Sequence, residues 1–302
     1  MNFPISHSHL APPVLVALGF VVGALGGFFG VGGSFLAGPA LFGLGLPMNF
    51  VIGTDLAHIV GKSIVAARKH HFLGNLDRRL ALLMVLGTVP GVEAGARTVE
   101  MLKRAADIDL VIGVAFIFIL VAVSGFMAWE GWATLKKGPP RAAAKKGDHS
   151  AFSFVAKRVQ RLRLPPYVSL PVSGIPRVSI WAIIGVSVAG GYLSGLLGGG
   201  AGYIRMPSMI YLLGVPTHIA VGTDLFEVII SAGVGTFTHA LKGNVDILIA
   251  LVMHAGAALG AQLGAYLTQY ISGPRIRLAF VPLPLIGAAI VAHALLTGQH
   301  AP

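Results

Sequence analysis

The chain has 302 residues, of which 55% are hydrophobic and 11% are charged, and its mean hydropathy is +0.81. A soluble globular protein carries about 25% charged residues, so this composition excludes that class. Because the sequence contains no cysteine, it can form no disulfide, thiolate metal site or cysteine nucleophile.

Charged residues gather in short stretches, and long apolar segments separate them. No Asp, Glu, Lys or Arg precedes Asp55, lies between Asp109 and Glu130, or follows Arg277. Several of these segments exceed the roughly 18 to 20 apolar residues that a bilayer-spanning helix requires. The sequence therefore predicts an all-α polytopic membrane protein.

The apolar segments form two similar halves, residues 11–132 and 178–298, on either side of a basic linker at 133–177. Each half is expected to hold a helix pair broken at a glycine-rich stretch, followed by three transmembrane helices. In the first half the helices are predicted over 12–30, 35–46, 50–69, 79–97 and 108–130. In the second half they are predicted over 179–197, 203–213, 217–239, 245–270 and 276–297.

Two pairs of matching segments relate the halves. "GLGLPMNFVIGTDLA" from Gly43 matches "LLGVPTHIAVGTDLF" from Leu212, and "HHFLGNLD" from His70 matches "HALKGNVD" from His239. This repetition predicts a pseudo-two-fold arrangement. If each broken pair crosses the membrane once, the halves lie parallel, and if it crosses twice, they are inverted. We favour the inverted arrangement, because inverted repeats are common in transporters.

The linker is the most basic part of the chain. Ten of the 22 Lys and Arg residues fall between Lys136 and Arg177. This accumulation is typical of a cytoplasmic segment under the positive-inside rule, with a weak attraction to anionic lipid. The net charge of +11 therefore does not indicate nucleic-acid binding.

Glycine-rich stretches, "GFFGVGGS" and "GLLGGGAGY", break the first helix of each half. Neither carries the Gly-Lys-Ser/Thr of a nucleotide-binding loop, so neither ATP nor another cofactor is expected. An unwound helix at membrane depth is tolerated where its backbone lines a cavity, and its N–H groups suit an anion. Close helix packing by small residues is the alternative. The glycines assigned to the substrate site are Gly32, Gly33, Gly199 and Gly200.

Two carboxylates, Asp55 and Asp224, occupy matching positions in the halves. A charge at the bilayer centre costs about 2.5 to 3.5 kcal/mol on insertion scales, so such residues normally face a bundle interior or a cavity. His58 follows Asp55 by three residues and Glu227 follows Asp224 by three, which places each pair on one helical face. We predict that these four residues take part in ion coupling or gating. Helix capping by the two aspartates is the alternative.

Two cations, Lys62 and Arg205, are flanked by apolar sequence. Lys62 lies on the same predicted helical face as Asp55, and Arg205 lies where the first half has Ala37. One cation from each half would suit an anionic substrate, and arginine binds oxyanions through forked hydrogen bonds. The alternative for Lys62 is snorkelling to the interface. The alternatives for Arg205 are a short loop position or a structural pair with an aspartate.

These motifs resemble the sulfite exporter TauE/SafE family, also called the toluene-sulfonate uptake permease family. The resemblance covers both halves and rests on the glycine-rich breaks, the "G(L/V)P" segments and the duplicated "GTDL" and "GN(L/V)D". It implies a multi-pass transporter of sulfite, thiosulfate or organosulfonates in a bacterial inner membrane. The family's glycine breaks match 30–33 and 198–200, and its GT helix starts match Thr54 and Thr223.

The sequence thus predicts a secondary transporter of a small sulfur-containing anion, with export favoured and with a proton or Na⁺ as the coupling ion. Binding is assigned to Lys62, Arg205, Thr54 and Thr223 together with the glycines. A cation or metal-ion transporter that uses the intramembrane Asp, His and Glu residues is the alternative function. No catalytic signature stands out, so an enzyme is not expected.

Overall fold

The computed structural model describes residues 2–3, 5–6, 8–31, 33–105, 107–136, 153–162 and 164–298. Helices dominate these residues, and two short hairpins lie outside the bundle. In chain order the elements are β1 (Asn2–Phe3), β2 (Ser8–His9), α1 (Pro12–Phe29), α2 (Ser34–Gly43), α3 (Met48–Phe72), α4 (Arg78–Ala105), α5 (Ile108–Lys136), α6 (Ser153–Gln160), β3 (Tyr167–Leu170), β4 (Ile175–Ser179), α7 (Ile180–Leu197), η1 (Gly199–Ala201), α8 (Gly202–Ser208), the π-helix η2 (Met209–Leu213), α9 (Thr217–Leu241), α10 (Ile247–Leu267), η3 (Thr268–Tyr270), α11 (Gly273–Phe280) and α12 (Pro282–Thr297).

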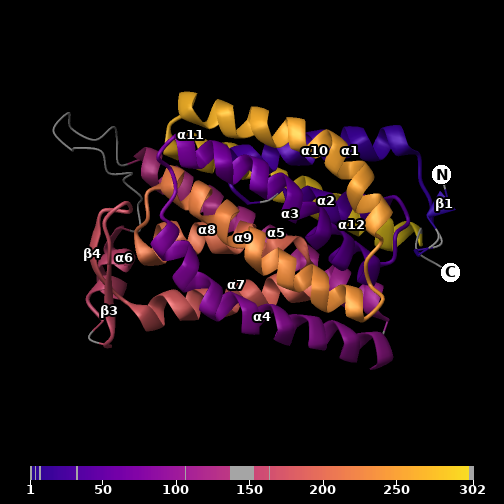
Figure 1. Cartoon of the computed structure of the whole chain (residues 1–302), viewed down its shortest axis with the longest axis horizontal. Helices are drawn as coiled ribbons and strands as arrows, with labels where there is room; N and C mark the ends of the chain where they lie inside the picture. The colour runs from indigo at the N-terminus through magenta and orange to yellow at the C-terminus, as the bar shows by residue number, and fades with distance from the viewer. Residues whose placement is uncertain are drawn as a thin grey trace.

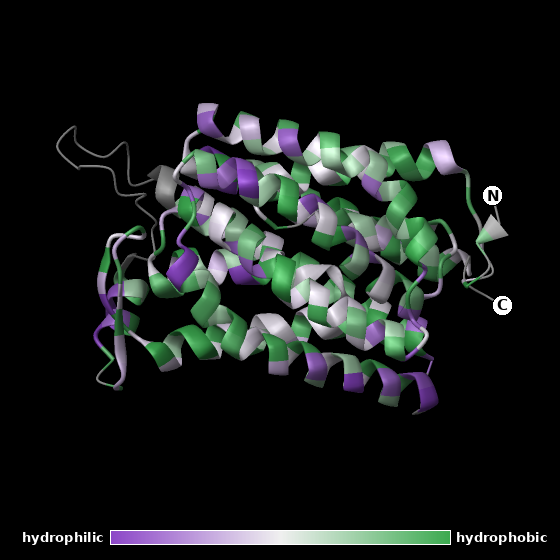
Figure 2. Ribbon diagram, in the orientation of Figure 1, coloured by the Kyte–Doolittle hydropathy of each residue, from purple (hydrophilic) through white to green (hydrophobic). Residues whose placement is uncertain are grey.

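Eight helices in the described part of the chain are long and apolar enough to cross a membrane. They are α1, α3, α4 and α5 in the first half, and α7, α9, α10 with η3, and α11 with α12 in the second. Apolar residues cover most of the bundle, and hydrophilic residues gather toward helix ends, as at the C-terminal end of α4 (Figure 2). The predicted all-α polytopic membrane protein is confirmed.

The helices begin and end close to the positions that the sequence predicts. Helices α3 and α9 each start directly after a proline, Pro47 or Pro216, because proline cannot continue a preceding helix but is compatible with a helix start. The largest difference is α4, which extends to Ala105 instead of 97. Salt bridges four residues apart, such as the 2.8 Å pair of Arg97 with Glu93, support this polar end.

Two pairs of helices pack closely along rows of glycine. Helix α10 lies parallel to α1, with Gly256, Gly260 and Gly264 against the α1 backbone. Helix α7 lies parallel to α4 in the same way, with Gly191 and Gly195 against the α4 backbone. Small residues allow such close approach between membrane helices, which accounts for many of the 41 glycines.

A hairpin precedes the first helix of each half, and a serine from each hairpin binds an aspartate of the other half. The Ser6 hydroxyl donates to Asp246 Oδ2 at 2.7 Å, and its backbone N–H donates to the same oxygen. The Ser173 hydroxyl donates to Asp77 Oδ2 at 2.6 Å, again with its backbone N–H. We call the end of the bundle with Ser6 the N-terminal side and the end with Ser173 the linker side.

These two sides lie at opposite ends of the bundle. Helix α4 begins directly after Asp77, and near its other end the Lys103 ammonium donates to Asn244 Oδ1 at 3.1 Å, two residues before Asp246. In Figure 1 strand β1 lies at one end of the long axis and the β3–β4 hairpin lies at the other. Helix α1 therefore starts on the N-terminal side and α7 starts on the linker side.

The short helix α2 returns the chain across the bundle. Helices α1 and α3 both end on the linker side, where His70 Nε2 donates to the Gly27 carbonyl at 3.0 Å. In the second half, His239 Nε2 donates to the Gly195 carbonyl at 3.1 Å, so α7 and α9 also run in the same direction as each other. Each half thus has five helical segments, one of them short. Corresponding segments of the two halves run in opposite directions. An inverted repeat requires this arrangement, and the repeat itself stays a prediction.

The predicted linker, residues 133–177, is only partly described. Residues 137–152 and 163 lie outside the described residues, and the described remainder holds the end of α5, α6, β3 and part of β4. Gln160 at the end of α6 donates to the Leu213 carbonyl of η2 at 2.7 Å. This segment is therefore docked on the second half, which nothing in its basic composition indicated.

We expect Gly260→Leu to destabilise the fold, because a Cβ at Gly260 would lie 2.8 Å from the Ala24 nitrogen of α1. Overpacking against backbone should cost about 3 kcal/mol. Thermal unfolding in detergent measures this loss. Gly185→Leu is the matched control, because no atom lies within 4 Å of a Cβ there. Equal melting temperatures of the two variants would contradict the close packing of α1 and α10.

Candidate functional site

The two glycine-rich breaks meet between α3 and α9. Gly198 has a positive φ of +78°, which favours glycine. A Cβ there would lie 2.9 Å from the Ile52 Cα of α3. A Cβ at Gly202 would lie 2.6 Å from both Val31 Cα of the first break and Asp224 Oδ2 of α9. The breaks therefore converge beside a buried carboxylate.

The glycines that the sequence analysis assigned to the site have different surroundings. Gly33 has a φ of +73° and precedes α2, and Gly199 and Gly200 have φ values of +72° and +69° within η1. A Cβ at Gly200 would overlap the Val228 side chain of α9. Gly32 lies outside the described residues.

Arg205 is the centre of a buried ion cluster. Its Nε donates to Asp224 Oδ1, and its Nη1 lies 2.5 Å from Glu227 Oε2. The Ser231 hydroxyl donates to the same Glu227 oxygen at 3.2 Å. At most 1% of each of the Arg205, Asp224 and Glu227 side chains is exposed. Removing Arg205 would leave two buried carboxylates without their cation, so both depend on this arginine.

A second polar row lies on α3. Lys62 Nζ is 3.2 Å from His58 Nδ1, and that nitrogen is 3.7 Å from Asp55 Oδ1. Because an ammonium can only donate, Nδ1 accepts and the His58 proton lies on Nε2. The His254 ring of α10 packs on Gly61 beside this row. All three polar side chains are buried, so they face the bundle interior and not the lipid.

The formal charges of the five charged residues in the two clusters do not sum to zero. Asp55, Asp224 and Glu227 carry three negative charges when ionised, and Lys62 and Arg205 carry two positive charges. With His58 neutral, the net charge is negative by one. The structure thus pairs each predicted substrate-binding cation with its own partners, and no described contact joins Lys62 to Arg205. An added proton or cation would neutralise the buried clusters.

Several buried polar atoms in this region have no hydrogen-bond partner within the described residues. They belong to the Tyr203 hydroxyl, His58 Nε2, Arg205 Nη2, Asp224 Oδ2 and Glu227 Oε1. Tyr203 is buried in α8, directly after the second break. Buried polar groups in folded proteins are normally bonded, so a polar ligand or water would be a fitting partner for these atoms.

Thr54 and Thr223 form hydrogen bonds between the halves. Thr54 Oγ1 accepts the backbone N–H of Asp246 at 2.9 Å, and Thr223 Oγ1 accepts that of Asp77 at 3.0 Å. Asp55 and Asp224 follow them and each lie seven residues after the first residue of their helix. Neither aspartate therefore caps its helix at the first turn, which removes the alternative interpretation raised for them.

Tyr203, Ser6 and Ser173 were not predicted from the sequence. Tyr203 is a polar side chain directly after a glycine break, and that position could have indicated it. Ser6 and Ser173 lie in short segments before each half, and only the structure shows the aspartates that they bind.

Comparison with known proteins supports a transport function. A family model described as Sulfite exporter TauE/SafE matches residues 15–291. The "Probable membrane transporter protein YunE" of Bacillus subtilis (strain 168) is 27% identical over 290 residues, covering 92% of this chain and 96% of that protein. "Probable membrane transporter protein YjnA" of the same organism is 24% identical over 280 residues, covering 92% and 95%.

A plant protein is similar over a shorter segment. The "Sulfite exporter TauE/SafE family protein 5" of Arabidopsis thaliana is 27% identical over 120 residues, covering 38% of this chain and 27% of that protein. No solved structure matches the chain.

We expect Arg205→Met to destabilise the folded protein by about 3 to 5 kcal/mol, because two buried carboxylates lose their partner. The triple variant Arg205→Met, Asp224→Asn, Glu227→Gln removes every charge of the cluster and should recover more than half of that loss. Unfolding in detergent compares the three proteins. If the single and triple variants were equally unstable, the ion cluster would not be the source of the effect.

Proposed function

This chain belongs to the sulfite exporter TauE/SafE family, and we propose that it is a secondary transporter of a small sulfur-containing anion such as sulfite, thiosulfate or an organosulfonate. The family is one of membrane transporters and not of enzymes. The chain is a multi-pass membrane protein, for which a bacterial inner membrane is a fitting location. Export is the direction that the family description suggests.

The observation that carries the proposal is the meeting of the two helix breaks beside buried, unpartnered polar atoms. Val31 of the first break and Gly202 of the second lie beside Asp224. Broken helices that meet at the interface of two halves are typical of substrate sites in secondary transporters. Asp55 and Asp224 lie about 10 Å along their helices at 1.5 Å per residue, well inside the apolar layer.

We assign the contacts with the anion to buried side-chain donors that have no partner within the described residues. His58 offers the Nε2 proton, Tyr203 offers its hydroxyl, and Arg205 offers Nη2. Lys62 holds His58 in the tautomer that presents Nε2–H, since it donates to Nδ1. Lys62 thus supports the site through His58, and Arg205 serves both the ion cluster and the substrate.

A net charge of −1, which the two clusters carry when all three carboxylates are ionised, favours a coupling ion. An anion that enters a region already negative by one raises the charge imbalance, which is costly at membrane depth. We propose that Asp55, Asp224 and Glu227 bind the coupling proton or Na⁺ that offsets it. Asp55 is the strongest candidate, because its nearest cationic partner, Lys62, is already bonded to His58.

The excess of carboxylates also favours the second candidate function, a cation transporter. Within the described residues, no group of three or more His, Asp and Glu side chains is arranged to hold a metal ion. A cation cargo would therefore be bound by fewer protein ligands than a transition metal usually takes.

We expect flux measurements in proteoliposomes to separate these functions. Vesicles are loaded with sulfite, thiosulfate, sulfoacetate or taurine, and a pH gradient is imposed. Lys62→Met and Arg205→Met should each lower anion flux at least tenfold, because one disturbs the His58 donor and the other removes a donor. Lys157→Gln, an exposed charge on α6, is the control and should retain parent flux. Anion flux that survives both site variants, or a cation flux alone, would contradict the proposal.

Asp55→Asn should separate coupling from binding. We expect this variant to lose most of the acceleration by the pH gradient, because an amide cannot carry the proton. Exchange of internal for external anion should persist within a few-fold of the parent, since exchange needs binding but no net proton movement. Equal loss of gradient-driven flux and exchange would assign Asp55 to substrate binding.

The two serine–aspartate contacts should close opposite ends of the pathway. Since the chain has no cysteine, a single Ser231→Cys reports access to the site by an impermeant thiol reagent. Adding Ser173→Ala should raise labelling from the linker side, and adding Ser6→Ala should raise it from the N-terminal side, each several-fold. Increased labelling from the same side in both variants would contradict this assignment.

A further inference from the structure

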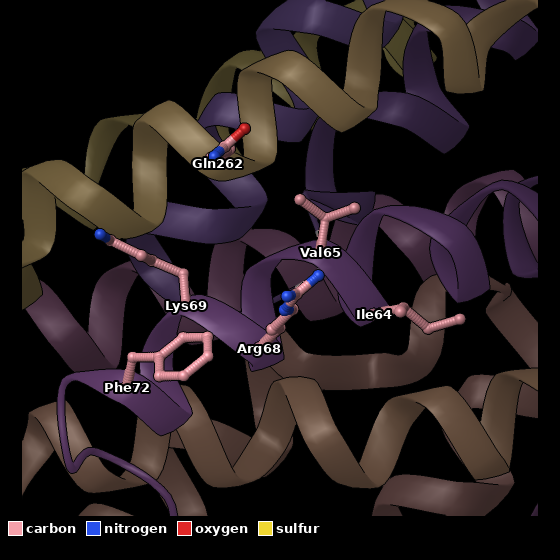
Figure 3. A pocket seen from close by; sticks show the side chains of 6 residues that line it. All are labelled: Ile64, Val65, Arg68, Lys69, Phe72 and Gln262. Carbon is pink, nitrogen blue, oxygen red and sulfur yellow. The ribbon is translucent and has the colours of Figure 1, made fainter.

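A groove outside the transport site lies between α3 and α10, near the linker side. It encloses about 490 Å³ and is lined by Ile64, Val65, Arg68, Lys69, Phe72 and Gln262. A second hollow of about 300 Å³ adjoins it, sharing Lys69 and Gln262 and adding Leu259, Leu263 and Tyr266. Figure 3 shows Gln262 on α10 facing the α3 side chains. We call the two hollows together the α3–α10 groove.

The groove holds two cations without carboxylate partners. Within the described residues, no salt bridge involves Arg68 or Lys69. The described acidic residues nearest in sequence are Asp55, in the interior of the bundle, and Asp77, which binds Ser173. Two adjacent positive charges therefore face the groove, and an anion would be the complementary ligand.

Aromatic rings hold these cations at the groove. Lys69 Nζ lies 5.0 Å from the centre of the Tyr266 ring, and the Arg68 guanidinium carbon lies 5.9 Å from that of Phe72. Tyr266 is itself hydrogen-bonded to Tyr270 at 2.7 Å. Such contacts fix long side chains that would otherwise spread through solvent. Tyrosine and basic residues at helix ends are also typical of the headgroup level of a bilayer.

Apolar side chains continue from the groove along the outer surface of the bundle. Ile64 is 50% exposed, Leu259 is 65% exposed and Leu263 is 45% exposed. All three lie in helices that cross the membrane, on the side of Arg68 and Lys69 toward the bundle centre. A ligand that fits the whole feature has an anionic head beside the cations and a hydrocarbon chain along this strip.

We propose that the α3–α10 groove binds an anionic phospholipid of the leaflet on the linker side, with its phosphate between Arg68 and Lys69. The positive-inside rule places the linker side in the cytoplasm, where anionic lipids create a negative surface potential. The site differs from the transport site, whose polar residues face the bundle interior. A lipid there would bridge α3, which carries Asp55 and Lys62, to α10.

The test measures which lipids contact the full-length protein in vesicles of phosphatidylcholine with spin-labelled phosphatidylglycerol or spin-labelled phosphatidylcholine. The parent should restrict the labelled phosphatidylglycerol more strongly than the labelled phosphatidylcholine. Arg68→Gln with Lys69→Gln should reduce this preference roughly five-fold for each charge, since one cation near the surface contributes about 1 kcal/mol. High salt should weaken the preference of the parent, and inorganic phosphate should leave it largely unchanged.

Arg78→Gln with Arg79→Gln is the matched control, because it removes two exposed charges on the same side but outside the groove. It should keep the parent's lipid preference. A parent without preference for phosphatidylglycerol, or equal loss in both double variants, would overturn the proposal. Lys69→Arg keeps the charge and should keep the preference, which distinguishes a lost lipid site from a misfolded protein. Groove variants that convert a dimeric parent to monomers without altering lipid preference would assign the groove to a second copy.

Discussion

The hydrogen bond between a threonine hydroxyl and the backbone of the opposite half is the contact on which this structure depends. Thr54 Oγ1 accepts the backbone N–H of Asp246 at 2.9 Å, and Thr223 Oγ1 accepts the backbone N–H of Asp77 at 3.0 Å. Directly before each threonine, Gly53 or Gly222 lets the opposite turn approach, since a Cβ there would meet its backbone. The bonds lie inside the bundle, where an unpaired backbone N–H is costly, so they fix the position of each half against the other.

This contact explains why the same short segments occur twice in the sequence. In "GTD" the glycine admits the opposite turn, the threonine binds it, and the aspartate then points to the interior cluster. In "GN(L/V)D" the glycines Gly74 and Gly243 have φ values of +73° and +70°, which turns the chain after α3 or α9. The final aspartate of that segment then accepts from the serine of a hairpin, Ser173 or Ser6. The repeated segments thus correspond to one set of contacts, which forms once on each side of the bundle.

Apolar runs, prolines and glycines predicted most of the fold, because membrane helices follow from local composition. The same signals placed Asp55 and Asp224 at equal depths and inside the protein. The partners of Arg205 could not be predicted in the same way. Glu227 is 22 positions away in another helix, and its contact depends on how α8 packs against α9. The hairpins were missed for a similar reason, since their serines have no local pattern and are defined by the aspartates they meet.

The two halves have matching serine–aspartate contacts but different buried charges. The proposed mechanism depends on this difference. In the predicted inverted repeat, the halves can exchange conformations, so that one side opens as the other closes. The serine–aspartate pairs suit such an exchange, because each side has the same donors and acceptor. Arg205 has no counterpart at Ala37, so the ion cluster stays on α9 and the Asp55 row stays on α3. In the proposed transporter the gates are therefore equivalent while the binding residues are not, and the substrate meets the same donors whichever side is open.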